Sequence, residues 1–182
     1  MTTSADSVRV AHPLFQAEGG GSKPTSALDL HVAQIQPKLA ARLNQQWHSV
    51  LPVMRNYHIK TTAYGAVFGG LLYAVAIWSY PVSRNLNFSG MYELRRFAIS
   101  PDAPRNTGSR MLRIMGLLVQ RSRPDVSCLI SYQDTERHEG TIYKAAGWVP
   151  SMKSDGGEWN SSSKIREPGQ ATGAKIRWEK RL

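Results

Sequence analysis

The residues best suited to chemistry lie in a basic loop between a strand-like run and a helix-like run. The loop reads R-N-T-G-S-R at 105–110, and apolar residues follow it at close to helical spacing, at 111, 112, 114, 115, 118 and 119. A helix that begins at such a loop directs free backbone N–H groups and the positive end of its dipole at the loop. The pattern therefore predicts an anion site, with Arg105 and Arg110 adding charge and Gly108 permitting close approach. A plain strand-to-helix turn with surface arginines is the alternative.

The patterns around this loop predict one α+β domain over residues 27–182. Residues 1–26 have linker composition and are expected to form a flexible tail. A helix is expected from Pro37, because proline suits the first helical position, and Gly69-Gly70 predicts a hairpin. The other expected elements are strands at 28–32, 64–68, 71–80, 92–99, 126–132, 148–149 (stopped by Pro150) and 174–178, a helix ending near 122, and a short helix at 140–146.

The composition limits the binding partners and the cellular compartment that are expected for this protein. The chain has 182 residues, and Lys+Arg exceed Asp+Glu by 10. Such an excess favours a polyanionic partner such as nucleic acid, a membrane surface or a phosphorylated cofactor, although it also serves solubility alone. Cys128 is the single cysteine, which excludes an internal disulfide and indicates a reducing cytosol. No signal-peptide pattern opens the sequence, and the apolar run 63–78 is too short to span a bilayer, so a cytoplasmic protein is expected.

Two segments resemble the GNAT acyltransferase superfamily. R-N-T-G-S-R resembles its pyrophosphate loop, Arg/Gln-x-x-Gly-x-Gly/Ala, with Arg110 in place of the last small residue. G-T-I-Y-K-A-A-G-W at 140–148 resembles the A-x-x-L-Y-E-K-x-G-F segment of that fold, and the order of elements also matches. The resemblance implies a mixed, mainly antiparallel sheet flanked by helices, with acetyl-CoA as cofactor. The cofactor-binding residues that it implies are Phe97, Ile99, Arg105, Asn106, Gly108, Ser109 and Arg110.

A narrower resemblance covers roughly residues 28–150. W-H-S at 47–49, the Y-E-L-R-R-F strand, R-N-T-G-S, S-Y-Q-D-T at 131–135 and H-E-G-T-I-Y at 138–143 look like the Mom family of phage DNA-modification proteins. These GNAT-like enzymes convert adenine in phage DNA to N6-carbamoylmethyladenine, which protects the DNA from host restriction. The same activity, in the host-cell cytoplasm, is therefore implied for this chain. Ser49 occupies the position after the histidine at which the family often has a tyrosine. The role of that tyrosine is then absent here or is taken by Tyr57.

The resemblance also implies the catalytic residues. Tyr143 corresponds to the GNAT tyrosine that lies near the CoA sulfur and protonates the leaving thiolate. Asp134 would accept a proton from the adenine N6 amine or orient it, with Ser131 and His48 completing the set. His48 and Asp134 would also suit a first-row metal such as iron. The alternatives are core packing for Tyr143, a turn or N-cap role for Asp134, and a purely structural role for His48.

DNA, either double-stranded or locally unpaired, is the expected partner, and a homodimer is compatible with the sequence. An enzyme acting on N6 must take the base out of the stack, and Trp47 and Trp159 are candidates to receive it. Two other functions remain open: an N-acetyltransferase for a protein or small-molecule amine, and a non-catalytic nucleic-acid-binding module. The basic residues expected to contact DNA are Lys60, Arg84, Lys153, Lys164, Arg166, Lys175 and Arg177.

Overall fold

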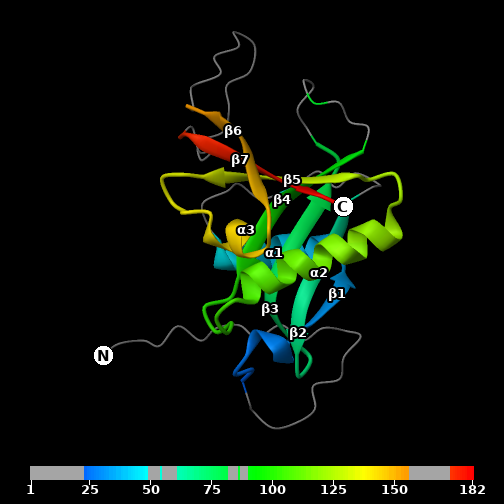
Figure 1. The fold of residues 1–182 in the computed structure, drawn as a ribbon. Coiled ribbons are helices and arrows are strands. Elements are labelled where there is room, and N and C mark those ends of the chain that lie inside the picture. Colours follow the sequence, from blue (N-terminus) through cyan, green and yellow to red (C-terminus); the bar gives the residue numbers. More distant parts are fainter. Residues whose placement is uncertain (1–22, 49–53, 55–60, 82–85, 87–89, 156–172) are drawn as a thin grey trace.

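Seven strands form one mixed sheet in the order β1-β2-β3-β4-β5-β7-β6 (Figure 1). The computed structural model describes residues 23–48, 54, 61–81, 86, 90–155 and 173–182. Neighbouring strands are antiparallel except β4 and β5, which pair in parallel. The elements are η1 Ala27–Asp29, β1 His31–Ile35, α1 Pro37–Trp47, β2 Thr62–Phe68, β3 Leu71–Ser79, β4 Met91–Ile99, α2 Thr107–Ser122, β5 Cys128–Asp134, α3 Thr141–Ala145, β6 Val149–Ser154 and β7 Lys175–Arg181.

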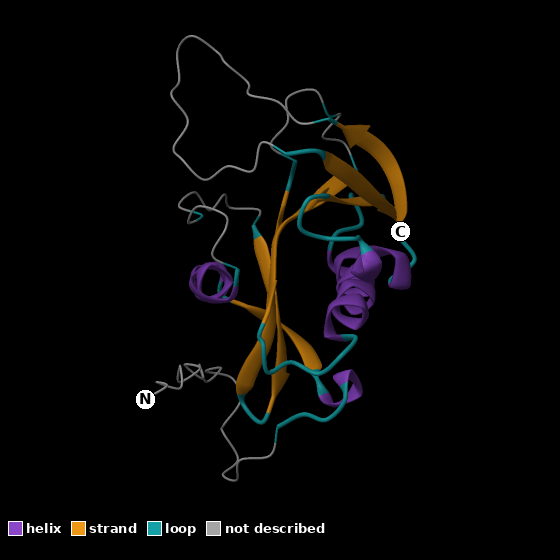
Figure 2. Cartoon of the chain, turned by 90° about the vertical axis from the view of Figure 1, so that its left-hand side faces the viewer, coloured by secondary structure: helices purple, strands orange, loops and turns teal. Residues whose placement is uncertain are grey.

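Helices cover the sheet on both faces. Figure 2 shows α1 alone on one face and α2 with α3 on the other. The core under α2 is rich in aromatic rings, including Trp78, Tyr92 and Trp178. The core under α1 is aliphatic and includes Leu43 and Ile77. The predicted α+β class, with a mainly antiparallel sheet and flanking helices, is confirmed.

Most helices and strands lie where short sequence patterns predicted them. Pro37 is the first residue of α1, where its missing N–H costs no hydrogen bond. Gly69 and Gly70 both have positive φ, 53° and 77°, as the turn of the β2–β3 hairpin requires. Among the described residues, no helix is both long and apolar enough to cross a bilayer.

Several predicted boundaries differ from the structure, and three of the differences have a clear physical reason. Leu28 is not in a strand: Ser26 and Asp29 form a capping box that folds residues 27–29 into a 3₁₀ turn, and Leu28 is 72% exposed. Pro150 does not stop β6, because β6 is the edge strand of the sheet and its register shifts beside Pro150, where no ladder N–H is needed. Strand β5 extends to Asp134, because each residue from 128 to 134 pairs with β7.

Candidate active site

Strands β4 and β5 part in the middle of the sheet. They pair from Met91–Cys128 to Leu94–Ser131 and no further. Beyond this point β4 pairs only with β3, and β5 pairs only with β7. The separation therefore begins beside Ser131, one of the residues that the sequence predicted for the site.

A β-bulge in β4 adjoins the same point. Leu94 pairs with Trp78 and Arg96 pairs with Ile77, so Arg95 is an extra residue without a partner on β3. An extra residue resets the alternation of side chains. As a result, Leu94 and Phe97, three residues apart, both contribute to the core on the α2 face.

Tyr143 and Ser131 form a buried pair where the strands part. Their hydroxyl oxygens are 2.9 Å apart, and Ser131 Oγ lies 3.4 Å from the carbonyl oxygen of Leu94. The Tyr143 ring stacks on Trp178 and meets Trp148 edge-on, with ring centroids 5.4 and 5.7 Å away. Burial raises the pKa of Tyr143, and the hydrogen bond with Ser131 opposes part of this shift. Tyr143 is therefore a neutral phenol at physiological pH, able to donate a proton.

The N-terminus of α2 is prepared for an anion. Asn106 adopts a left-handed conformation (φ 66°) and does not cap the helix with its side chain, and the first turn has no acidic residue. The N–H of Thr107 donates to Pro104 and that of Arg110 to Asn106. Within the described part of the chain, this leaves the N–H groups of Gly108 and Ser109 without an acceptor. Their geometry favours a bound anion at this end of the helix.

Arg110 is a second feature that suits an anion. Its Nε atom is buried and has no hydrogen-bond partner among the described residues. A buried donor without an acceptor is costly, so native proteins rarely retain one. Arg105 and Asn106 are exposed beside it. These residues fit a pyrophosphate group such as that of acetyl-CoA.

Gly108 also has a packing role. A Cβ added there would lie 3.0 Å from both Ile142 of α3 and Ile99 of β4. The glycine thus lets α2 sit close to its neighbours. A larger side chain at this position would therefore press on both isoleucines. Ile99 and Phe97 pack on the α2-face core, on the same side of the sheet as the loop.

His48 meets His138 across the fold. The two rings have centroids 5.9 Å apart. His48 caps the C-terminal end of α1 through its backbone, and its Nδ1 atom is buried without a hydrogen-bond partner among the described residues. The structure thus brings His48 to the loop that follows β5.

Asp134 begins the turn after β5. Its Oδ1 accepts a hydrogen bond from the N–H of Glu136, and its Oδ2 lies 3.5 Å from Nε of Arg137. Within the described residues, His, Cys, Asp and Glu side chains form no group of three or more that could hold a metal ion. Iron on His48 and Asp134 therefore remains a prediction, and no step is assigned to it.

Sequence reasoning missed the contacts that hold His138. Trp178 Nε1 donates to Gln133 Oε1 at 2.7 Å, and Gln133 Nε2 donates to the carbonyl of His138. Gly140 closes the loop with φ 72°, and a Cβ there would lie 2.5 Å from Gln133 and 2.6 Å from Trp178. A glutamine in a strand that reads as buried was the available signal.

The DNA-contact candidates divide into two groups. Lys153, Lys175 and Arg177 lie on β6 and β7, and Trp47 is half-buried against the α1-face core. The others lie outside the described residues: Lys60, Arg84, Trp159, Lys164 and Arg166.

The parted strands, the anion-binding loop and the buried tyrosine define a GNAT-like acetyltransferase fold. Similar solved structures include a Bacillus subtilis acetyltransferase in complex with CoA, with a TM-score of 0.59 and 13% identity over 84% of this chain and 99% of that chain. A GNAT-family acetyltransferase from Streptococcus pneumoniae gives 0.58 and 13% over 84% and 99%. One from Elizabethkingia anophelis, with acetyl-CoA bound, gives 0.55 and 12% over 85% and 99%.

Residues 29–174 match the sequence model of the Mom protein family, so the chain belongs to that family. A comparison with curated protein sequences finds no match. The identities to the solved structures are low enough that they establish the fold alone.

Proposed function

We propose that this protein uses acetyl-CoA to convert adenine in DNA to N6-carbamoylmethyladenine, and so protects phage DNA from host restriction. The observation that carries the proposal is the buried Tyr143–Ser131 pair at the point where β4 and β5 part. Membership of the Mom family supports the choice of DNA as the substrate. The excess of 10 basic over acidic residues agrees with a polyanionic partner.

In this proposal the N-terminus of α2 holds the pyrophosphate. The N–H groups of Gly108 and Ser109 would donate to its oxygens, and Arg110 would contribute its buried Nε. Phe97 and Ile99, on the same side of β4, would line the path toward Ser131. Acetyl-CoA supplies an activated two-carbon acyl group on a thiol leaving group.

Tyr143 would act on the leaving group. Either hydroxyl of the Tyr143–Ser131 pair can be the donor. When Ser131 turns its single hydrogen from the Leu94 carbonyl to Tyr143, the phenolic hydrogen of Tyr143 is free for transfer to the CoA sulfur as the thioester opens. Because burial keeps the pKa of Tyr143 high, the phenol retains that hydrogen until the thiolate develops.

Asp134 and His48 would act on the acceptor side. The adenine N6 amine is a weak nucleophile, because its lone pair is delocalised into the ring, so positioning and a base matter more than for an alkyl amine. His48 has a buried Nδ1 that meets no hydrogen-bond partner in the described part of the chain and could supply that base, while Asp134 would orient the amine. Joining N6 to the methyl carbon requires a two-electron oxidant, and an ammonia-level nitrogen nucleophile must displace the thiolate at the carbonyl to form the amide. His48 and Asp134 would therefore act on N6, whereas Tyr143 would protonate the thiolate that this second nitrogen displaces.

The test is expression in bacteria followed by digestion of the DNA to nucleosides and mass spectrometry. We expect an adenosine heavier by a carbamoylmethyl group, and we expect it to be absent with Tyr143→Phe. Calorimetry with acetyl-CoA separates the other functions. Bound acetyl-CoA without modified adenosine would favour an N-acetyltransferase for another amine, as the similar solved acetyltransferases suggest. Absence of both would favour a nucleic-acid-binding module.

A further inference from the structure

We propose that duplex DNA docks on the face of the sheet that carries α1, opposite the face that carries α2. We call this surface the α1 face: the outer side of α1, Arg96 of β4, and the residues of β5, β7 and β6 that point to the same side. The inference rests on the proposed function and adds to it the surface that receives the substrate.

The charged residues of α1, Lys38 and Arg42, are both cations. The helix reads P-K-L-A-A-R-L-N-Q-Q-W, with no acidic residue. Lys38 and Arg42 are exposed, whereas Ala40 and Leu43 are buried against the sheet. A surface helix usually gains from opposite charges one turn apart, and α1 has none. Its charge is therefore available to an external anion.

The same face of the β5–β7–β6 half-sheet lies beside α1. Among the described elements, α1 packs mainly on β2, β3 and β4. Ile176 and Trp178 of β7 belong to the α2-face core, so alternation turns Lys175, Arg177, Glu179 and Arg181 to the α1 face. Val149 and Met152 of β6 pair with residues of that set and are 62% and 47% exposed. No described helix is among the main neighbours of this half of the face.

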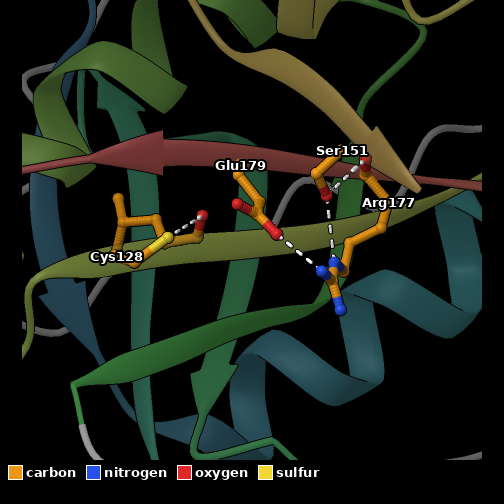
Figure 3. A network of polar contacts seen from close by, with 5 residues as sticks. Cys128, Ser151, Arg177 and Glu179 are labelled. Atoms are coloured by element: carbon orange, nitrogen blue, oxygen red, sulfur yellow. Dashed lines mark hydrogen bonds and ion pairs between the residues drawn. The ribbon is translucent and has the colours of Figure 1, made fainter. Parts of the chain in front are cut away.

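The acidic residues on this face lie close to arginines. Glu179 lies 2.8 Å from Arg177, which also donates from Nε to Ser151 Oγ at 3.0 Å (Figure 3). Asp134 lies 3.5 Å from Arg137. The charges of these carboxylates are thus partly compensated within the protein. Lys175 and Arg181 remain as further cations at the two ends of β7.

Arg96 links the two halves. It pairs with Ile77, which belongs to the α1-face core, so its side chain lies on that side of β4. Burial and the neighbouring Arg95 lower the pKa of Arg96, while Glu93 opposes this shift. A half-buried guanidinium whose charged form is disfavoured would be stabilised by a nearby phosphate. Cations thus extend from α1 through β4 to β7.

The location suits a reaction on DNA. The anion-binding loop of α2 and the Tyr143–Ser131 pair lie on the opposite face of the sheet from α1. Strands β4 and β5 stop pairing beside Ser131, so no backbone ladder separates the two faces beyond that point. DNA on the α1 face would present an extruded adenine from the side away from acetyl-CoA. Cofactor and polymer would then not compete for one surface.

The test reverses charge on each face in turn. Lys38→Glu with Arg42→Glu changes the α1 face, and Arg113→Glu with Arg121→Glu makes the same change on exposed positions of α2. Binding of a short fluorescent DNA duplex is measured by anisotropy over a salt series, with acetyl-CoA affinity measured in parallel. We expect the α1 pair to weaken DNA binding by about tenfold or more and to reduce the slope of log K against log salt by about 2, since each phosphate contact contributes about 0.9. The α2 pair should change the slope by less than half as much.

Each outcome decides a separate point. Equal weakening by the two pairs, or greater weakening by the α2 pair, would overturn the docking surface. Should the wild-type protein modify and bind DNA while the α1 pair has no effect, docking fails and the proposed function stands. If the wild type neither binds nor modifies DNA, both fail. A changed molar mass in light scattering with unchanged DNA binding would assign the α1 face to a second copy.

Folding is controlled within the same experiment. Thermal melting should place both charge-reversed proteins close to the wild type, because all four positions are exposed. If the α1 pair unfolds, Lys38→Ala with Arg42→Ala removes the charge without introducing repulsion. The same fall in slope is then expected, and an unchanged slope contradicts the proposal.

Discussion

Tyr143→Phe removes one hydroxyl group and keeps the ring. The ring retains its stacking on Trp178 and its edge contact with Trp148. Among the described residues, the hydroxyl has one hydrogen-bond partner, Ser131 Oγ at 2.9 Å, and Ser131 keeps a second contact with the Leu94 carbonyl. Loss of one such hydrogen bond should lower the free energy of unfolding by about 1 kcal/mol.

The expected loss of activity is much larger than this loss of stability. A positioned proton donor contributes about 10²–10⁴ in rate, which corresponds to roughly 2.7–5.5 kcal/mol in the barrier. A domain of this size remains folded after losing about 1 kcal/mol. A fall in rate of about a hundredfold or more would therefore reflect the missing proton and not unfolding.

Ser131→Ala is the matched control for Tyr143→Phe. It breaks the same hydrogen bond from the other end but leaves the phenol in place, at a cost of about 1–3 kcal/mol because a buried hydroxyl loses its partner. Modified adenosine is quantified by mass spectrometry in DNA from bacteria sampled soon after each variant is induced, because the cells supply the oxidant and the nitrogen donor as well as acetyl-CoA. We expect Tyr143→Phe to be at least about tenfold slower than Ser131→Ala. Tyr143→Phe activity within about threefold of the wild type, or equal losses in the two variants, would refute the role of Tyr143 as an acid.

Three further predictions concern the cofactor loop, the loop that holds His138, and alkaline stability. Arg110→Ala should weaken acetyl-CoA binding by about tenfold in calorimetry, since a charge-assisted hydrogen bond contributes about 1.5–3 kcal/mol. Arg113 is exposed on the same helix, so Arg113→Ala should bind acetyl-CoA as the wild type does. Equal affinities of the two variants would show that Arg110 is not a phosphate ligand. Gly140→Ala should lower the free energy of unfolding by several kcal/mol in urea denaturation. Gly147→Ala is the control: its φ of 75° is similar, but only the tip of a lysine lies 3.5 Å from the new Cβ, so it should cost about 1–2 kcal/mol. Similar costs for the two variants would mean that Gln133 and Trp178 shift to make room at little cost. Stability should fall as pH rises above about 10, because burial holds tyrosine pKa values in the folded state above the unfolded value, so the unfolded chain loses protons first. Tyrosinate absorbance that appears before unfolding begins would contradict this for the buried side chains Tyr64, Tyr92 and Tyr143 and for the half-buried Tyr132.

The elements with strong local signals could be predicted from the sequence. The helical spacing after Arg110, the proline at position 37 and the Gly69-Gly70 turn all act over a few residues, so no distant contact overrides them. The sequence similarly predicted the strand, loop and helix around Gly108, although not the packing that requires a glycine there. The family resemblance predicted both the fold and the family.

The arrangement of the site depended on contacts between distant residues. His48 lies beside His138, 90 positions along the chain, and no local pattern specifies that approach. Gln133 and Trp178 are 45 residues apart and meet only because β5 and β7 pair. The β4 bulge at Arg95 was also beyond prediction, because an extra residue shows only when the partner strand is known. Even Leu28 was misplaced by a capping box whose two residues flank it.

The position of β7 has a consequence for how the protein is made. Strand β7 follows β6 in sequence but lies between β5 and β6 in the sheet, and it carries Trp178, on which Tyr143 stacks. During synthesis the chain emerges from the ribosome N-terminus first, and its segments fold as they emerge. Residues 31–99 can form their hairpins early, whereas β5 lacks one neighbour and Tyr143 lacks its stacking partner until synthesis has passed Trp178. The site is thus among the last parts of the domain to assemble, so an incomplete nascent chain holds its tyrosine in an unfinished pocket.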